Sequence, residues 1–272
     1  MDIAFYKMHG AGNDFILVDD RALRFPMEDP AWIARVTARR TGVGSDGVAL
    51  IRPSESADFR MVFLNPDGSE ASMCGNAARC IARLAAELGA APTRMRIETR
   101  AGILRAEANG DTVRVGMTDP HGWQPDRRLT WDDAPAVVGH VLDTGVSHFV
   151  TEVDDLDATD VHGLGGRIRR HPAFAPEGVN ANFIRVDGKG QLHVRTYERG
   201  VEAETLACGT GMVACALVAA RLGRAKLPVI VIPASGDRLE VDGAPDGEAF
   251  REVTLTGPAV HVYRGDLVYP GA

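Results

Sequence analysis

Apolar residues along this chain occur in short runs, many of them alternating with polar residues, and glycine, proline, aspartate or asparagine separate the runs. Such runs predict β-strands, because successive side chains of a strand point to opposite faces of a sheet. Strands are expected at residues 3–8, 15–18, 48–51, 58–64, 95–99, 104–108, 113–117, 192–197 and 260–263. Residues 9–14, which include two glycines, form the expected turn between the first two strands.

Other stretches have the longer period of a helix. Residues 29–40 carry Pro30 near their start, where the missing N–H of proline costs no hydrogen bond. After Cys74, apolar residues recur with helical spacing until Gly89, a residue that suits the position just beyond a helix end. The pattern therefore predicts many short strands around one long apolar helix.

The sequence repeats itself at an offset of 134 positions, about half of the 272-residue chain. The motif Met-Cys-Gly-Asn-Ala-Ala-Arg-Cys at 73–80 returns as Ala-Cys-Gly-Thr-Gly-Met-Val-Ala-Cys at 207–215. The same shift aligns residues 44–46 with 178–180, and Gly102 with Gly236. A shared offset over so long a stretch indicates two structurally similar domains that face each other across one cleft.

The repeat predicts an α/β (α+β) fold of two pseudo-symmetric domains. The N-terminal domain is expected to span residues 1–118 plus 261–272, and the C-terminal domain residues 119–260. The boundary between the domains follows from the turn signal at 118–120. The last expected strand, 260–263, comes after the end of the second copy, so it is assigned to the first domain.

Composition and charge narrow the function. The net charge is −7, and the short basic run Arg167, Arg169 and Arg170 is typical of a solvated face, so nucleic acid is not an expected partner. The longest uncharged apolar run lies between Glu204 and Arg221, shorter than the roughly 20 residues of a membrane-spanning helix, and it predicts a buried helix. The first 20 residues lack the apolar core of a signal peptide, so we expect a cytoplasmic protein without membrane attachment.

The four cysteines form two unlike pairs. Cys80 and Cys215 lie inside expected helices and are typical core residues. Cys74 and Cys208 each stand at a polar, glycine-containing helix start, where backbone N–H groups and the helix dipole stabilise a thiolate. Their spacing does not match a zinc site, and no metal is expected.

Two such helix starts, related by a pseudo-twofold axis, would hold one carboxylate and place one sulfur on each face of the adjacent α-carbon. This arrangement suits racemisation or epimerisation, in which one thiolate removes the α-proton and the opposite thiol delivers another. None of Lys7, Lys189 and Lys226 lies in a motif that suggests a Schiff base, so no cofactor is expected.

The chain resembles the diaminopimelate epimerase family at residues 7–15, 63–70, 73–80, 197–200 and 207–211. The resemblance implies two domains, each a curled, mostly antiparallel sheet wrapped around a central helix. It implies a homodimeric, cofactor-independent enzyme that interconverts LL- and meso-diaminopimelate on the path to lysine and peptidoglycan.

By the same resemblance, Cys74 and Cys208 are the acid/base thiols, and His148 and Glu198 are a pair that tunes them. The residues expected to bind the substrate, an amino acid with two zwitterionic ends, are Asn13, Asn65, Gly75, Asn76, Asn180, Glu198, Arg199, Gly209 and Thr210. Arginine suits a distal carboxylate, because its planar fork binds the two oxygens together. Without the family context, the asparagines are typical turn residues and His148 a typical core or surface histidine.

Two positions depart from the family pattern: Gly47, where members often carry glutamine, and Val146, where they often carry asparagine. These departures fall at the recognition end of the site. They leave open another cofactor-independent racemase of the same fold, acting on histidine, proline or hydroxyproline. A protein in which Cys74 and Cys208 form a reversible disulfide is a further alternative, from a different class.

Overall fold

The computed structural model describes residues 1–247 and 249–271. It divides the chain into two compact units, residues 1–115 with residues 256 onward, and residues 116–255. The chain leaves the first unit within β8 (Thr112–Gly116) and returns within β17 (Ala249–Pro258). Each of these strands thus continues across a boundary between the two units, at 115/116 and at 255/256.

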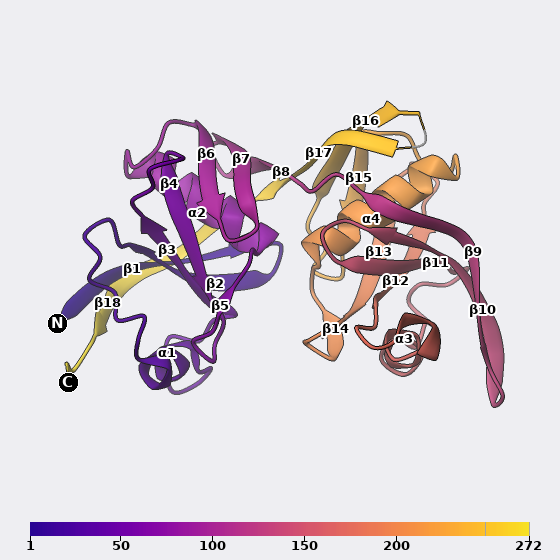
Figure 1. Ribbon diagram of the computed structural model, residues 1–272, viewed down its shortest axis with the longest axis horizontal. Helices are drawn as coiled ribbons and strands as arrows, with labels where there is room; N and C mark the ends of the chain where they lie inside the picture. The colour runs from indigo at the N-terminus through magenta and orange to yellow at the C-terminus, as the bar shows by residue number, and fades with distance from the viewer. Residues whose placement is uncertain (248, 272) are drawn as a thin grey trace. The chain divides into compact units, whose positions relative to one another are not determined.

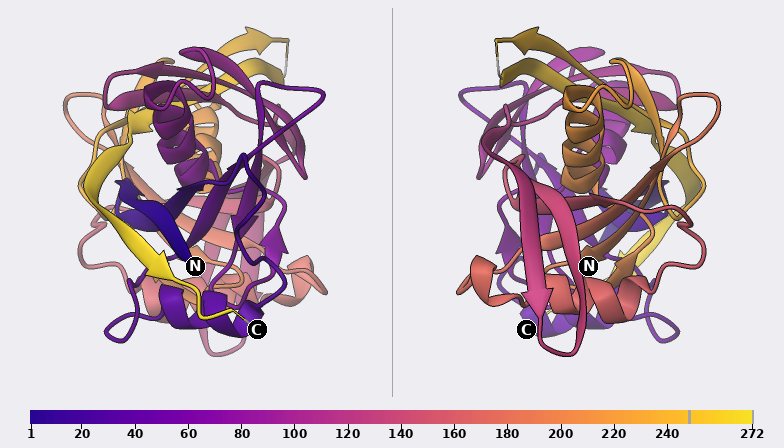
Figure 2. Two further views of the ribbon diagram at one scale, coloured as in Figure 1. Left: turned by 90° about the vertical axis from the view of Figure 1, so that its left-hand side faces the viewer. Right: turned by 90° about the vertical axis from the view of Figure 1, so that its right-hand side faces the viewer.

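The first unit is a mostly antiparallel sheet. Its N-terminal strand β1 (Asp2–Gly10) lies between β2 (Asn13–Asp19) and β18 (Val260–Val268), and both neighbours run antiparallel to it. Figure 2 shows β18, in yellow, alongside the indigo β1. The sheet is completed by β3 (Gly47–Arg52), β4 (Phe59–Leu64), β5 (Glu70–Ala71), β6 (Arg94–Thr99), β7 (Gly102–Asn109) and β8. Two of its pairings, β2 with β3 and β4 with β6, are parallel.

The second unit repeats this plan. Its strands are β9 (His121–Trp131), β10 (Ala134–Asp143), β11 (Ser147–Glu152), β12 (Asn180–Val186), β13 (Leu192–Glu198), β14 (Ala203–Thr205), β15 (Val229–Ile232), β16 (Leu239–Asp246) and most of β17. Again two pairings, β11 with β12 and β13 with β15, are parallel. The antiparallel pair β9 and β10 forms a long two-stranded ribbon that the strand spacing of the sequence did not predict (Figure 2).

One helix is enclosed by the strands of each unit (Figure 1). α2 (Gly75–Glu87) and α4 (Gly209–Arg221) both have 13 residues and start 134 positions apart, as the repeat predicts. In α4, residues 211–219 are all buried, which explains why this stretch is apolar on every side. Gly89 and Gly223 follow the two helices with φ of 64° and 69°, the left-handed conformation of a helix terminator.

The repeat extends to strand register. Phe15 pairs with Gly47 in the first unit, and Phe149 pairs with Ala181 in the second, so both partners are shifted by the same 134 positions. Two equivalent parallel strand pairs therefore lie beside two equivalent helices. The expected fold class, two similar domains each with a central helix, is confirmed.

Two smaller helices cover outer faces. α1 (Pro30–Thr37) starts at the N-cap Asp29, whose carboxylate accepts a hydrogen bond from the N–H of Trp32 at 2.8 Å. It ends before the expected residue 40, because the following loop folds back and the N–H of Val43 takes the carbonyl of Val36 at 2.9 Å. The second unit has α3 (Val161–Arg169), followed by the short 3-10 turn η1 (Pro172–Phe174). No helix in the described part of the chain is long and apolar enough to cross a membrane.

The hairpin between β1 and β2 brings its end close to α2. Ala11 and Gly12 have φ of 58° and 90°, the two positive values of a tight two-residue turn, so Gly10 pairs directly with Asn13. A Cβ atom on Gly10 would lie 3.0 Å from the carbonyl oxygen of Asn76 and 3.2 Å from the Arg79 guanidinium. Glycine at this position allows β1 to contact the first turn of α2.

We therefore expect Gly10→Ala to lower the free energy of unfolding by about 1–3 kcal/mol, because the added methyl group overpacks this contact. Denaturant unfolding followed by circular dichroism measures the change. Gly188→Ala is the matched control: a Cβ there meets no atom within 4 Å, so its stability should stay within about 0.5 kcal/mol of wild type. Equal stability of the two variants would contradict the close approach.

Candidate active site

Cys74 and Cys208 occupy equivalent places, each as the N-cap of the buried helix of its own unit. Their carbonyl oxygens accept the first helical hydrogen bonds, from Ala78 N at 2.8 Å and from Met212 N at 2.9 Å. Neither side chain makes the cap hydrogen bond of its helix. The first-turn N–H groups at the positive end of each helix dipole are thus suited to an anion such as a carboxylate.

The other two cysteines are core residues, as the sequence predicts. Cys80 and Cys215 are each 0% exposed. Burial raises the pKa of the Cys80 thiol to about 12, and it raises the pKa of Cys215 well above its ordinary value. Both side chains therefore remain thiols at physiological pH, and neither can serve as a base.

In the first unit, the structure brings together two expected substrate ligands. The amide nitrogen of Asn76, in the first turn of α2, donates to Oδ1 of Asn13 at 2.6 Å. The amide nitrogen of Asn13 in turn donates to Oδ2 of Asp46 at 3.1 Å. A chain of hydrogen bonds thus runs from Asp46, just before β3, to the helix start that carries Cys74.

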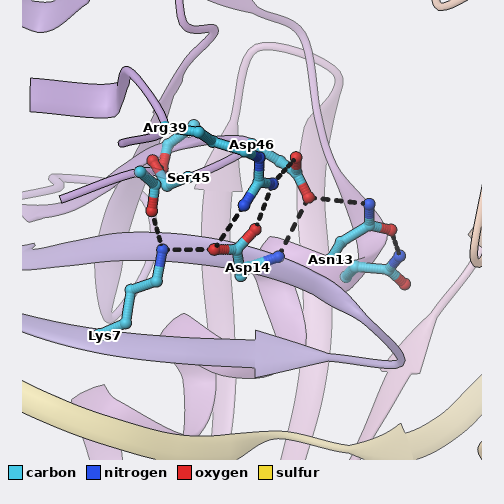
Figure 3. Close-up of polar contacts among 9 residues, drawn as sticks. Lys7, Asn13, Asp14, Arg39, Ser45 and Asp46 are labelled. Carbon is cyan, nitrogen blue, oxygen red and sulfur yellow. Dashed lines mark hydrogen bonds and ion pairs between the residues drawn. The ribbon is translucent and has the colours of Figure 1, made fainter. Parts of the chain in front are cut away.

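Charged side chains hold Asp46 and its neighbour Asp14 in place (Figure 3). The Arg39 guanidinium lies 2.7 Å from carboxylate oxygens of both residues. The buried Lys7 ammonium donates to Asp14 and to the carbonyl of Gly44. Burial alone would raise the pKa of Asp14, but hydrogen bonds from Arg39 and Lys7 outweigh it and hold that pKa below its ordinary value. The Asp14 carboxylate is therefore ionised near neutral pH.

Asn65 lies in the turn between β4 and β5. Its side-chain amide nitrogen donates to the Ser69 hydroxyl at 3.0 Å. Its backbone N–H donates to the Ser69 carbonyl at 2.8 Å. These bonds stabilise the turn itself, the role that asparagine often has without a ligand.

In the second unit, three expected residues meet where β12 begins and β13 ends. Oδ1 of Asn180 accepts a hydrogen bond from the N–H of Arg199 at 2.8 Å, and its amide nitrogen donates to the carbonyl of Ser147 at 3.2 Å. Glu198 accepts a hydrogen bond from the Thr205 hydroxyl at 2.9 Å. Thr210 lies in the first turn of α4, with its hydroxyl 3.6 Å from the sulfur of Cys208.

His148 lies on β11 and is 0% exposed. Burial and the positive charge of Arg199 lower its pKa to about 3, and a hydrogen bond with Asn182 opposes them only in part. The imidazole is therefore neutral at physiological pH. Any influence that His148 has on a thiol must come from a neutral ring and not from an imidazolium ion.

The packing around Gly47 explains the missing side chain there. A Cβ atom on Gly47 would lie 2.6 Å from the ring of Phe63 and 2.7 Å from the carbonyl oxygen of Leu64. Phe63 in turn stacks edge-on against Phe15, with ring centroids 5.8 Å apart. A hydrophobic ring fills the space that a polar side chain at position 47 would need. At the second departure, the carbonyl of Val146 accepts a hydrogen bond from the N–H of Thr144 at 3.1 Å.

Sequence reasoning assigned no role to Asp46 or Asn182, although signals for both were present. The repeat aligns Asp46 with the expected ligand Asn180, and the structure places the two at equivalent points of the parallel strand pairs. Asn182 follows Asn180 at the two-residue period of a strand, so both side chains face the same side. A second asparagine beside the apolar residues of this strand was a sign of a buried polar cluster.

Among the residues that the structure describes, no group of three or more histidine, cysteine, aspartate or glutamate side chains is arranged to hold a metal ion. The polar groups at the two helix starts are instead backbone N–H groups and neutral amides. This donor set is suited to a carboxylate ligand.

A family model for diaminopimelate epimerase matches residues 5–123 and 140–262. The chain belongs to the diaminopimelate epimerase family. Diaminopimelate epimerase of Aquifex aeolicus (strain VF5) is 42% identical over 275 residues, which cover 97% of this chain and 97% of that protein. The enzyme of Archaeoglobus fulgidus is also 42% identical, over 280 residues, 98% of this chain and 97% of that protein.

More distantly related proteins share the fold of this chain. A crystal structure of a probable proline racemase from Agrobacterium radiobacter K84, with bound carbonate, superposes with a TM-score of 0.73. It is 18% identical and covers 98% of this chain and 93% of that one. At this identity the similarity concerns the fold alone.

The contrast between the cysteines predicts a labelling pattern. Between about pH 7 and 9, iodoacetamide should leave Cys80 and Cys215 of the folded protein unmodified, because alkylation requires the thiolate and burial raises both pKa values. Cys74, which is partly exposed, should be labelled first. Peptide mass spectrometry reads out each site, and labelling in denaturant provides the control in which all four cysteines react. Early labelling of Cys80 in the folded protein would refute its assignment to the core.

Proposed function

We propose that this protein is a two-base epimerase, independent of cofactors, that interconverts LL-2,6-diaminopimelate and meso-diaminopimelate. The observation that carries the proposal is the paired helix start. In a member of this family, two buried helices 134 positions apart each begin at a cysteine followed by glycine. The reaction serves lysine and peptidoglycan biosynthesis.

In the proposed reaction, Cys74 and Cys208 act from opposite faces of the α-carbon. The thiolate form of one cysteine takes the α-proton, and the electron pair of the broken C–H bond moves into the adjacent carboxylate, which becomes enolate-like. The thiol of the other cysteine then protonates the opposite face. The first sulfur ends protonated and the second ionised, so the reverse reaction uses the same groups with exchanged roles.

The difficult part of this reaction is the weak acidity of the α-carbon. The first-turn N–H groups of α2 and α4 would stabilise the negative charge that develops on the carboxylate. Gly75 suits this role, because a Cβ atom there would meet nothing within 4 Å and the backbone lies open to a ligand. Gly209 and Thr210 are proposed to act in the same way at the start of α4.

We assign the recognition of the rest of the substrate to Asn13, Asn65, Asn180 and Arg199. The Arg199 guanidinium donates to the carbonyl of Gly178 at 3.4 Å, a long bond that leaves most of its donors for a distal carboxylate. Asn76, whose side-chain amide donates to Asn13, is proposed to act at the end of the substrate that reacts. Glu198 and His148 are proposed to tune the two thiols.

We further propose that the enzyme works in the cytoplasm as a homodimer, binds neither nucleic acid nor membranes, and requires no metal or pyridoxal phosphate. The net charge of −7 supports the exclusion of nucleic acid, because phosphate binding relies on basic surfaces. A reducing compartment suits the proposed chemistry, because a disulfide between the two thiols would remove both the base and the acid.

Deuterium exchange tests the proposed reaction. In D₂O, LL-diaminopimelate incubated with the enzyme should gain one deuterium at the α-carbon as its configuration scrambles, because solvent protons reach the substrate through the thiols. Proton NMR and chiral chromatography follow the two events. A panel of proline, hydroxyproline and histidine should show no exchange. Preferential exchange of any of these three would assign the protein to another racemase of this fold.

Removal of either thiol should abolish turnover. We expect Cys74→Ala and Cys208→Ala each to lower kcat by roughly 100-fold to 10,000-fold or more, because each removes one proton-transfer group. The controls Cys80→Ala and Cys215→Ala should cost roughly 1 kcal/mol of stability through lost packing and retain turnover. Near-normal turnover in either of the first two variants would rule out the two-base mechanism.

A further inference from the structure

A buried polar cluster lies beside the start of α4, on three adjacent strands of the second unit. His148 on β11 and Asn182 on β12 are both 0% exposed, and Thr196 on β13 is 3% exposed. The cluster borders the helix start itself: a Cβ atom on Gly211 would lie 2.7 Å from Oδ1 of Asn182 and 3.2 Å from the sulfur of Cys208. A polar cluster placed so deeply must have its hydrogen bonds satisfied in a defined arrangement.

The surroundings of Asn182 fix the orientation of its amide. Nδ2 lies 3.0 Å from the carbonyl oxygen of Phe149 and 3.2 Å from that of Asn180, and these oxygens can only accept hydrogen bonds. On the other side, Oδ1 accepts a hydrogen bond from the Thr196 hydroxyl at 2.9 Å. The reversed amide would set its oxygen against two carbonyl oxygens, so this orientation is the only one that the surrounding groups permit.

The fixed amide in turn selects the tautomer of His148. Nδ2 of Asn182 lies 3.2 Å from Nδ1 of the ring. The amide nitrogen has no lone pair, and its two hydrogens are shared among Nδ1 and the carbonyl oxygens of Phe149 and Asn180. A proton on Nδ1 would face these hydrogens, so Nδ1 is the unprotonated acceptor. The single proton of the neutral ring is then on Nε2. A flipped ring would present carbon to the amide and lose this bond.

Charge on the ring is disfavoured from both directions. Burial and the nearby Arg199 oppose an imidazolium ion, and a second proton on Nδ1 would face the Asn182 hydrogens. Nε2 is buried and has no hydrogen-bond partner among the described residues. The ring thus presents one N–H and no free lone pair, which makes it a donor suited to an anion.

The internal repeat provides an independent comparison. The first-unit counterparts of His148 and Asn182 are Asp14 and Val48. Asn182 pairs across the sheet with Thr196, whereas Val48 pairs with Leu64. Val48 and Leu64 are both buried and apolar. The fold therefore accepts an apolar pair at these positions. The polar pair occurs in the unit that has the histidine, which indicates a role linked to that ring.

We propose that Asn182, held by Thr196, is a positioning residue that keeps the His148 proton on Nε2, so that His148 serves the active site as a neutral hydrogen-bond donor and not as a base. The anion that it would serve is a cysteine thiolate or the carboxylate of the substrate. This role rests on the proposed epimerase function, but the tautomer itself is a property of the resting protein.

Nitrogen NMR of the ¹⁵N-histidine-labelled protein measures the tautomer directly, with the His148 signals assigned by their loss in His148→Gln. We expect a protonated Nε2 and an unprotonated Nδ1, with neither signal titrating between about pH 5 and 9. A protonated Nδ1, or a titrating ring, would overturn the proposal. This readout needs no turnover, so it stands even if the protein proves not to be an epimerase.

Variants connect the tautomer to the reaction. Asn182→Val copies the first unit and removes the donor to Nδ1; the signature of a fixed Nε2 proton should be lost, and kcat should fall roughly 10-fold to 100-fold with KM little changed. In the single variant the Thr196 hydroxyl loses its acceptor. If that variant fails to fold, the double variant with Asn182→Val and Thr196→Val, which removes this hydroxyl as well, is used for the same measurements. A folded variant that keeps both the Nε2 proton and wild-type kcat would overturn the proposal.

Thr151→Val is the matched control. Thr151 is a buried residue on β11, as His148 is, and its hydroxyl donates a hydrogen bond to the carbonyl of Val138 at 2.8 Å, so this variant also loses one hydroxyl. It should retain the Nε2 tautomer and wild-type kcat. Equal losses in the control and in Asn182→Val would reduce the role of Asn182 to stability alone and overturn the proposal.

Discussion

The burial of α2 and α4 is the constraint on which the candidate site depends. A helix surrounded by strands has few positions where its backbone can meet a ligand, and its N-terminal turn is the one that also carries unpaired N–H groups and a positive dipole. Cys74 and Cys208 occupy the N-cap of these turns, while Cys80 and Cys215, less than two turns further along, are sealed in the core. A cysteine at the N-cap is thus placed where a thiolate is stabilised, whereas a cysteine further along the same helix stays a buried thiol.

Much of this arrangement followed from the sequence, because its determinants are local or periodic. Helical spacing after Cys74, a glycine at each helix end and a single offset of 134 positions were enough to predict two similar units with equivalent helices. The contrast between the two kinds of cysteine followed from position alone. The family motifs then identified residues such as Asn13 and Asn76, which the structure joins by a hydrogen bond of 2.6 Å.

What the sequence did not predict depends on contacts between distant segments. The end of α1 is set by a loop that returns to its last carbonyls, and the ribbon of β9 and β10 by pairing that no short motif encodes. The state of His148 needs three strands at once: β11 for the ring, β12 for Asn182 and β13 for Thr196. A histidine in a motif has no defined tautomer until its neighbours are placed, so its role could be suspected from sequence but not specified.

The packing of Phe63 against Gly47 also bears on how this enzyme can change over generations. A side chain at position 47 would clash with both the Phe63 ring and the carbonyl oxygen of Leu64, so a mutation there is harmful unless both groups move. Phe63 in turn supports Phe15, which follows the Asn13–Asp14 segment, so a smaller residue at 63 would itself loosen the start of β2. A substitution at 47 is therefore expected to be tolerated only together with changes in the residues around it. Position 47 is thus inherited together with the core groups that surround it, and any new side chain there must first be accommodated by the hydrophobic core.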